Sequence, residues 1–262
     1  MNNFTCFRTI ADHFNFKTKS NCKLLFIALI LSFYHGFTQN ANHGEIIYGQ
    51  KMHDTTIINV KKIPDNVLGT IKNKILSLKE NSERINYKLR FDDSLSVFKA
   101  EKIMDIDNQE SINNTILAAD ANGDWYTNLE SNVSVRSFKF LDQKILIKYT
   151  KVEDWIVTSE RKNINGYNCF KAIRKKSLDN GKEIEVIAWF TNEIPLNLGP
   201  KNYFGLPGLI IELIENKFTF YLKNIKFKSS KKNIETPNDG KVLSEIEFKD
   251  YVKNAMKKKW DY

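Results

Sequence analysis

The sequence is poor in the residues from which covalent frameworks and many active sites are built. It has 3 cysteines, 4 histidines and 5 prolines in 262 residues. Cys6 and Cys22 lie near the start of the chain, so Cys169 has no disulfide partner in the remainder. The chain also has no apolar run of the roughly 20 residues that a membrane-spanning helix needs. Burial of apolar side chains must therefore hold the fold together.

The histidines form no catalytic or metal-binding motif. Beyond the first forty residues there are only His43 and His53, and neither belongs to an i, i+4 pair or to the Cys/His cluster that zinc requires. A cysteine or serine nucleophile would need one of these two as its base, and no Gly-x-Ser-x-Gly sequence is present. We therefore predict no catalytic residues, no cofactor and no metal site.

Acidic residues leave one alternative open. Asp105, Asp107 and Gln109 have the spacing of a calcium loop, but Glu110 stands where glycine is required and Ile116 where glutamate is required. The two carboxylates of a hydrolase need only be close in space, so sequence spacing does not exclude them. A carboxylate-dependent hydrolase therefore stays an alternative to a non-enzymatic protein.

The first 39 residues have the order of an export signal. A basic region precedes the apolar run 24–34, and a polar segment follows it. The run has only eleven residues, which is short for a membrane anchor. We therefore predict a signal peptide over residues 1–39 and an exported protein, periplasmic or extracellular, with association to the outer membrane as one option. After removal of the signal we expect no integral membrane segment.

Basic residues outnumber acidic ones by 40 to 31, which gives a formal net charge of +9. They alternate with apolar residues along most of the chain, which is typical of the solvated faces of strands. No concentrated basic strip is present, so we predict no nucleic-acid partner. Hydrophobic residues make up 42% of the chain, as in a folded globular domain.

Residues 40–262 are predicted to form one domain, because their apolar residues recur mainly with the two-residue period of β-strands. Short polar turns separate the strands, which predicts antiparallel hairpins that turn at residues 92–93, 141–143 and 165–166. A change of apolar parity near Asn224 predicts a β-bulge.

Two segments have the three- and four-residue spacing of helices. Residues 65–80 have one apolar stripe, and residues 244–247 form a capping box that begins a C-terminal helix. The predicted fold class is α+β but mainly β. It consists of a single curved antiparallel sheet, half-barrel-like, with one or two packed helices.

The sequence Gly205-Leu206-Pro207-Gly208 stands directly before the apolar segment 209–211. Proline fixes φ near the value required at the second position of a type II turn, and glycine tolerates the positive φ required at the third. The strand that follows is apolar on both faces. We therefore predict that it is paired on both sides and covered on both faces.

The hexapeptide Gly205-Leu206-Pro207-Gly208-Leu209-Ile210 resembles the GLPGLI family of exported Bacteroidota proteins, which is named for it. Further matches to the family are Trp155, Gly166, Tyr167, Cys169, Lys171 and Ala172. Phe190 and Asn192 depart from it, since tyrosine and proline are common there. The resemblance implies an exported protein of unknown function, and it gives no catalytic residues.

Aromatic and apolar residues around the hexapeptide suggest a ligand-binding rim on the 192–208 loop. The candidates are Trp189, Phe190, Pro195, Tyr203, Phe204 and Leu206. They would form an apolar mouth for a hydrophobic ligand, although a buried core uses the same residue types. We predict a non-enzymatic binding or accessory protein whose partner is a hydrophobic ligand or an envelope protein. A structural partner of an outer-membrane transporter is the further alternative.

Overall fold

The computed structural model describes residues 43–53, 65–105, 107–150, 154–178, 181–228, 230 and 233–260. The chain divides into two compact units, Met1–Ala41 and Asn42–Tyr262, and the described residues belong to the second. The predicted signal peptide, residues 1–39, lies outside the described residues. Among the helices that the structure describes, none combines the length and the apolar composition needed to cross a bilayer.

The described chain alternates between long runs of strands and single helices. The first half comprises β1 (His43–Met52), α2 (Asp65–Arg84), β2 (Asn86–Asp92), β3 (Leu95–Ala100), α3 (Gln109–Ala118), β4 (Asp124–Asn128), β5 (Val133–Phe140) and β6 (Gln143–Thr150). The second half comprises β7 (Ile156–Ile164), β8 (Tyr167–Ser177), β9 (Glu183–Thr191), β10 (Leu209–Glu215), β11 (Phe218–Phe227), β12 (Lys241–Leu243) and α4 (Glu245–Trp260).

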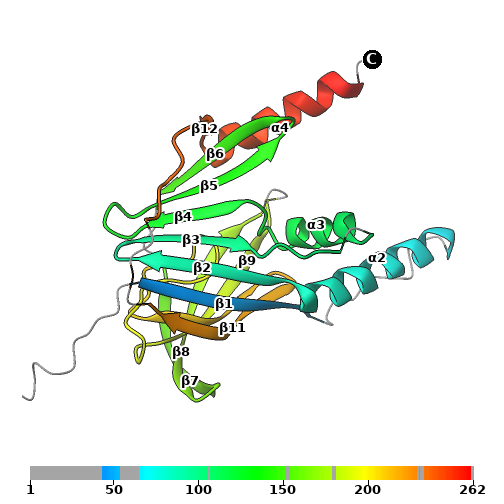
Figure 1. Ribbon diagram of the computed structural model, residues 1–262. Coiled ribbons are helices and arrows are strands. Elements are labelled where there is room, and N and C mark those ends of the chain that lie inside the picture. Colours follow the sequence, from blue (N-terminus) through cyan, green and yellow to red (C-terminus); the bar gives the residue numbers. More distant parts are fainter. Residues whose placement is uncertain are drawn as a thin grey trace, which may run out of the picture. The chain divides into compact units, whose positions relative to one another are not determined.

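All the described strands belong to one open, curved sheet of twelve strands, in the order β12-β6-β5-β4-β3-β2-β1-β11-β10-β9-β8-β7. Figure 1 shows β4, β3, β2, β1 and β11 side by side. Strands account for 48% and helices for 21%, so the predicted mainly β fold class is confirmed. The pairing is antiparallel with one exception, since the short β12 runs parallel to β6.

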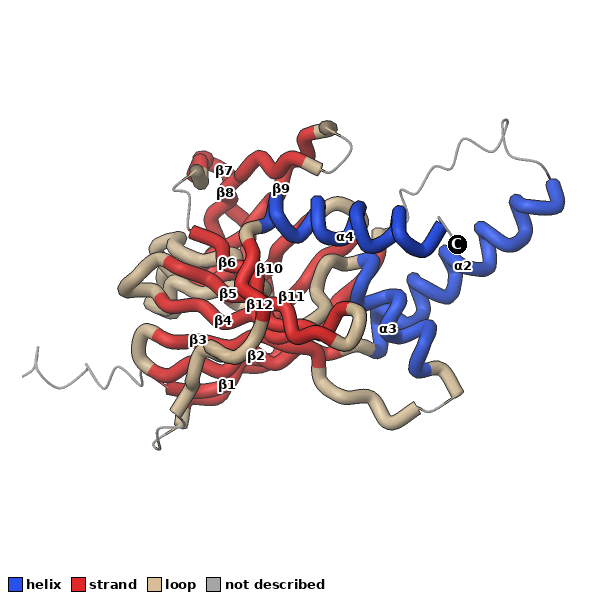
Figure 2. The backbone as a smooth tube through the Cα atoms, turned by 90° about the horizontal axis from the view of Figure 1, so that it is seen from above, coloured by secondary structure: helices blue, strands red, loops and turns tan. Residues whose placement is uncertain are grey.

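The helices lie at two places along the sheet (Figure 2). Helix α2 packs against β1 and α3, and the Asn81 amide donates to Ser111 Oγ across the two helices at 2.8 Å. Helix α4 lies beside β6 and β12. Its predicted capping box is confirmed, because Glu247 N–H donates to Ser244 Oγ at 3.2 Å and Ser244 N–H donates back to Glu247 Oε2 at 2.7 Å.

Helix α3 is not among the helices predicted from the sequence. Only Ile112 and Thr115 of its ten residues are buried, so its apolar stripe is too thin to identify it. The predicted hairpins at 141–143 and 165–166 are confirmed. The first hairpin turns at 93–94, one residue later than predicted.

The predicted β-bulge in β11 is also confirmed. Ile47 pairs with Asn224 and Tyr48 with Leu222, so Lys223 is the extra residue. The extra residue places Ile225 and Phe227 on the same face of the sheet as Phe218 and Phe220. This is the parity change visible in the sequence.

The entry of the chain into β10 differs from the predicted type II turn. In that turn Gly208 would have φ of about +80°, and the N–H of Leu209 would donate to the C=O of Leu206. Instead Gly208 has φ of 149° and its own N–H donates to Leu206 C=O at 2.7 Å, which closes a γ-turn around Pro207. Leu209 N–H is bound to Ile194 C=O at 3.1 Å, so it is not available to the wider turn.

Strand β10 itself has the predicted environment. It pairs with β9 on one side and β11 on the other, and Leu209, Ile210, Ile211 and Leu213 have no exposed surface. The buried Tyr48 hydroxyl donates to Ile210 C=O at 2.7 Å, because the backbone at the beginning of β10 is irregular and leaves this oxygen free of the ladder.

Gly208→Ala is expected to lower the free energy of unfolding by about 3 kcal/mol. A Cβ atom there would lie 1.9 Å from Thr191 O, so backbone of β9 must shift. Gly166→Ala is the matched control, because Gly166 also has positive φ, 90°, but has nothing within 4 Å. The control should cost about 1–2 kcal/mol. Urea denaturation measures both, and equal losses would contradict the proposed close contact between the turn and β9.

Candidate functional site

Two adjoining hollows of about 290 and 320 Å³ form a cleft within the described part of the protein. Their volumes are at the lower end of the range for small-molecule sites. The two hollows share a set of lining residues: Asp120, Tyr149, Lys176, Ser177, Glu245 and Lys249. These belong to the α3–β4 connection, β6, β8 and α4. Because β6 and β8 stand near opposite ends of the strand order, the curvature of the sheet brings them to one cleft.

The carboxylate of Glu215, at the end of β10, lines the first hollow and is the centre of a buried polar network. Glu215 Oε1 accepts hydrogen bonds from Lys176 Nζ at 2.6 Å and from the Tyr203 hydroxyl at 2.8 Å. Its Oε2 atom forms an ion pair with Lys201 Nζ. Glu215 is 6% exposed and Lys201 2%, so this pair is almost fully removed from water.

Asp120, which follows α3, extends the network. Its Oδ2 atom accepts from Lys176 Nζ at 3.1 Å, and its Oδ1 atom accepts from Arg136 of β5 at 2.9 Å. Arg136 also stacks on Trp125, with 4.6 Å between the guanidinium carbon and the ring centroid. The Lys201 ammonium group donates to Ala119 C=O at 3.3 Å. The network therefore joins α3, β5, β8 and β10.

Both carboxyl groups of the network remain ionised. Burial alone would raise the pKa of Glu215, but the ammonium groups of Lys201 and Lys176 outweigh it and hold that pKa below its ordinary value. The pKa of Asp120 is lowered in the same way, because Lys201, Arg136 and Lys176 outweigh the effect of its burial. Neither carboxyl group is a proton donor near neutral pH.

The pKa values of the basic and phenolic groups are shifted in different directions. Burial lowers the pKa of Lys201, although its charge is compensated by Glu215 and Asp120. For Lys176 the two carboxylates outweigh burial and raise the pKa. Burial, and then the charge of Glu215, raises the pKa of Tyr203 well above its ordinary value. Tyr203 therefore stays protonated and donates its hydrogen bond to Glu215.

Apolar side chains also line the first hollow. They belong to β6, β9, β11 and α4, namely Ile147, Ile184, Phe218 and Phe248, and two of them stand beside the network, because Phe218 pairs with Glu215 and Ile184 with Lys176. Phe248 makes an edge-to-face contact with Phe138 of β5 at 5.2 Å between centroids, which holds α4 over this end of the sheet. The cleft thus has charged and apolar side chains next to each other.

The six rim candidates predicted from the sequence do not form an open apolar mouth. Phe190, Tyr203, Phe204 and Leu206 are 2–5% exposed and belong to the core of the protein. Trp189 is half-buried, with Lys162 Nζ 4.2 Å from its ring centroid. Pro195 is exposed. A buried side chain offers no surface to a ligand, and of the six only Tyr203 lines the cleft.

The other residues of the predicted motif have structural contacts. Cys169 is free and 1% exposed, and burial raises the pKa of its thiol to about 11, so it is a core residue rather than a nucleophile. The Trp155 indole N–H donates to Phe204 C=O at 3.4 Å and its ring lies 6.0 Å from Tyr203. Gly166 and Tyr167 stand at the β7–β8 hairpin.

One feature of the sequence, a glutamate on a buried strand face, could have indicated the network but did not enter the prediction. In β10 the buried face includes Leu213 and Glu215, so a glutamate occupies a position where an apolar residue is expected. A carboxylate on a buried face requires a cationic partner. Its partners Lys176 and Lys201 belong to other elements, so strand periodicity does not identify them.

Comparison with known proteins gives a partial family match and a weak structural likeness. A family model described as "Protein of unknown function (Porph_ging)" matches residues 174–212, from the end of β8 into β10. This match is consistent with a Bacteroidota-type family, while membership of the GLPGLI family stays a prediction. No curated protein matches the sequence.

A solved structure described as "Structure of PNGF-II in P21 space group" aligns with a TM-score of 0.49 and 16% identity. The alignment covers 80% of this chain and 32% of that one, so this chain spans about a third of its length. A likeness at this level supports no inference about function.

Glu215→Gln is expected to lower the free energy of unfolding by about 3–5 kcal/mol, because it leaves the buried Lys201 ammonium group without its partner. Adding Lys201→Met to this variant should restore part of the loss, since the unpaired charge is then removed. Chemical denaturation of the single and double variants measures this coupling. If the second substitution adds a further loss of stability, the two residues are not an energetically coupled pair.

Acid should destabilise the protein through the same carboxylates. Groups with lowered pKa in the folded state stabilise it fully above their unfolded values, 4.5 for glutamate and 3.8 for aspartate, and this contribution is lost as the pH falls through the folded values. Unfolding should therefore become easier as the pH is lowered below about 4.5. The double variant Glu215→Gln/Lys201→Met should lose less stability between pH 6 and about pH 3. Identical pH profiles would mean that Glu215 has an ordinary pKa.

Proposed function

We propose that this chain is an exported, non-enzymatic binding protein and that its ligand is a small anionic amphiphile held in the cleft. The observation on which this rests is an excess of positive charge in the cleft next to apolar side chains. The residues that line the two hollows include five basic ones, Arg136, Arg174, Lys175, Lys176 and Lys249, and three acidic ones, Asp120, Glu215 and Glu245. The excess positive charge attracts an anion to the cleft.

The apolar lining residues would receive the other part of the ligand. Ile184 and Phe218 are partly or fully buried residues of the sheet that line the first hollow, and Phe248 of α4 lines it as well. Burial of an acyl or aromatic group against them is favourable by about 25 cal/mol per Å² of apolar surface. The predicted hydrophobic ligand is thus retained in the proposal, with a negatively charged group added.

The ionisation of the network favours binding over hydrolysis. A glycosidase-type mechanism needs one carboxyl group with a raised pKa to act as an acid. In the network both carboxyl groups have lowered pKa values and are occupied by ammonium or guanidinium groups. Lys201 has a lowered pKa, but it is 2% exposed and in contact with Glu215, so a substrate has no path to it.

Export is part of this proposal and is supported by the sequence of residues 1–39. The basic region, the short apolar run and the polar segment after it have the order of a signal peptide. An envelope protein is the alternative partner.

A dansyl-labelled fatty acid tests the proposal by fluorescence titration. Lys249→Gln is expected to weaken binding several-fold, because Lys249 lines both hollows. Lys253→Gln is the matched control, because Lys253 is also exposed and lies one turn further along the same helix but lines neither hollow, and it should bind as wild type. Ile184→Gln should weaken binding, whereas Ile187→Gln, on the opposite face of β9, should not.

The methyl ester of the same probe has no charge, so it separates the contribution of the carboxylate to binding from that of the acyl chain. Wild type should bind the ester more weakly than the acid, and Lys249→Gln should bind the two alike. No saturable binding of either probe, or equal effects of Lys249→Gln and Lys253→Gln, would contradict an anionic amphiphile in this cleft. Turnover that is lost in Asp120→Asn at unchanged thermal stability would favour the hydrolase instead.

A further inference from the structure

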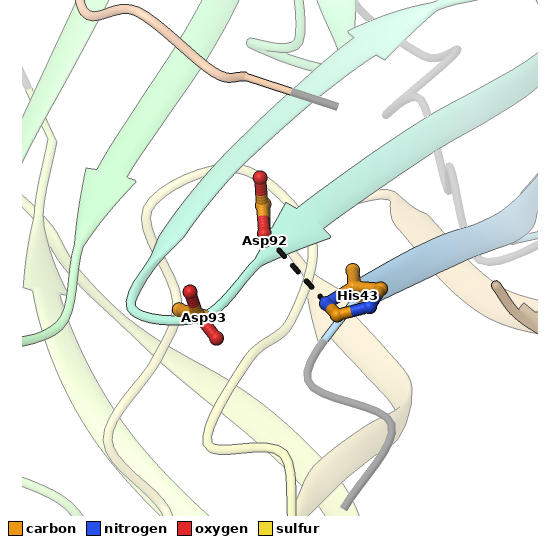
Figure 3. A group of neighbouring side chains, drawn as sticks. All are labelled: His43, Asp92 and Asp93. Carbon is orange, nitrogen blue, oxygen red and sulfur yellow. Dashed lines mark ion pairs between the residues drawn. The ribbon is translucent and has the colours of Figure 1, made fainter. Parts of the chain in front are cut away.

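A histidine and two aspartates meet at one corner of the sheet, away from the residues that line the cleft. His43 is the first residue of β1 and pairs in register with Asp92, the last residue of β2. Asp93 follows in the β2–β3 turn, where it has φ of 52°. Figure 3 shows the three side chains around one point, with Asp92 directed toward the His43 ring. Their ligand atoms all lie within 4.8 Å of one another.

Two of these atoms have unmet bonding capacity. His43 Nδ1 and Asp92 Oδ1 are buried, and neither has a hydrogen-bond partner. They face each other at 3.7 Å, which is within the range of an ion pair when His43 is protonated but too long for a hydrogen bond. Asp92 is 8% exposed, so water does not compensate its carboxylate oxygen. A buried polar atom without a partner is costly and rare in folded proteins.

A metal ion between the two atoms would account for their separation. Ligands that each lie about 2.0–2.1 Å from a tetrahedral zinc ion are about 3.3 Å apart. The gap of 3.7 Å between His43 Nδ1 and Asp92 Oδ1 is close to this value. A bound cation would satisfy both atoms at once, and Asp93 would supply a third ligand from the turn.

The donor set selects the class of metal. Calcium and magnesium prefer ligand sets made of oxygen atoms, whereas imidazole nitrogen favours zinc and similar transition metals. One imidazole and two carboxylates match the second class. The two aspartates also provide two negative charges, which balance a divalent cation.

Two described basic residues near His43 lie beside Glu45. Lys228 lines a small cavity beside His43, but its ammonium group is bound to Glu45 at 2.8 Å. Arg90 lines the same cavity and stands opposite Glu45 in the β1–β2 register. Glu45 thus reduces the positive charge near the site.

We propose that His43, Asp92 and Asp93 form a binding site for a divalent transition-metal ion of the zinc type. The site is independent of the proposed amphiphile cleft. Three protein ligands leave a coordination position open, as in zinc sites that bind a further small ligand. Its location at the beginning of β1 would also connect β1 to the β2–β3 turn.

Zinc titration of the full, untagged chain tests the site by calorimetry. His43→Gln and Asp93→Asn are expected to weaken one zinc-binding event by at least about tenfold, since even residues that only support metal ligands contribute ten- to a hundredfold. Asp142→Asn is the matched control, because Asp142 also lies at positive φ, 61°, in a hairpin turn. It should bind zinc as wild type. All variants retain Cys6 and Cys22, so zinc bound at those thiols is common to every sample.

Thermal melting with and without zinc provides the second measurement. Zinc should raise the melting temperature of wild type and Asp142→Asn, and it should not raise that of His43→Gln or Asp93→Asn. Asparagine adopts positive φ as readily as aspartate, so Asp93→Asn is expected to fold. Wild-type zinc affinity in both ligand variants would overturn the proposal. Equal stabilisation by calcium, unaffected by His43→Gln, would overturn the assignment to a zinc-type ion.

Discussion

The buried carboxylate of Glu215 is the interaction that ties the described fold to its cleft. It stands at the end of β10, and it binds Lys176 of β8, Lys201 of the 192–208 loop and the Tyr203 hydroxyl. Through Lys176 and Lys201 it also reaches Asp120 and the end of α3. A charge placed so deeply is stable only while its partners are present, so the loop, the helix end and two strands must adopt one arrangement together.

The curvature of the sheet makes this network possible. Strands β5 and β6 lie near one end of the strand order and β8 near the other, yet all three contribute to the cleft. A flat sheet would place them many strands apart. The position of β10 is fixed at its other end by the turn at Pro207 and Gly208, which packs against Thr191 of β9. The hexapeptide therefore has a structural role, because it sets where β10 begins and thus where Glu215 lies.

Much of the sheet could be predicted from local pattern. Two-residue periodicity identified most strands, a parity change located the bulge beside Asn224, and short polar sequences located the hairpins. The parallel strand β12 and helix α3 were missed, because three residues are too few for a period and α3 buries too little apolar surface. The aromatic residues near the hexapeptide fitted either a ligand-binding rim or a buried core. The structure places Phe190 and Phe204 in the core.

The candidate sites depend on contacts between distant segments, so the sequence showed only fragments of them. Glu215 on a buried face was the one local sign of the cleft, whereas nothing near Lys201 indicates its partner. In the same way, His43 appears isolated in the sequence, and it meets Asp92 only because β1 and β2 pair in this register. Register and curvature are properties of the whole sheet, and local periodicity does not determine them.

The ionisation state of Glu215 is the most direct test of whether the cleft binds its ligand or acts as an acid. Carbon-13 NMR of the labelled side-chain carboxyl, followed through a pH titration, measures it without changing a residue. The expected result is a pKa below the ordinary value of 4.5, with the carboxylate charged throughout the neutral range. A carboxyl group that takes up its proton near pH 7 would contradict the ion-pair network and would instead support catalysis by Glu215.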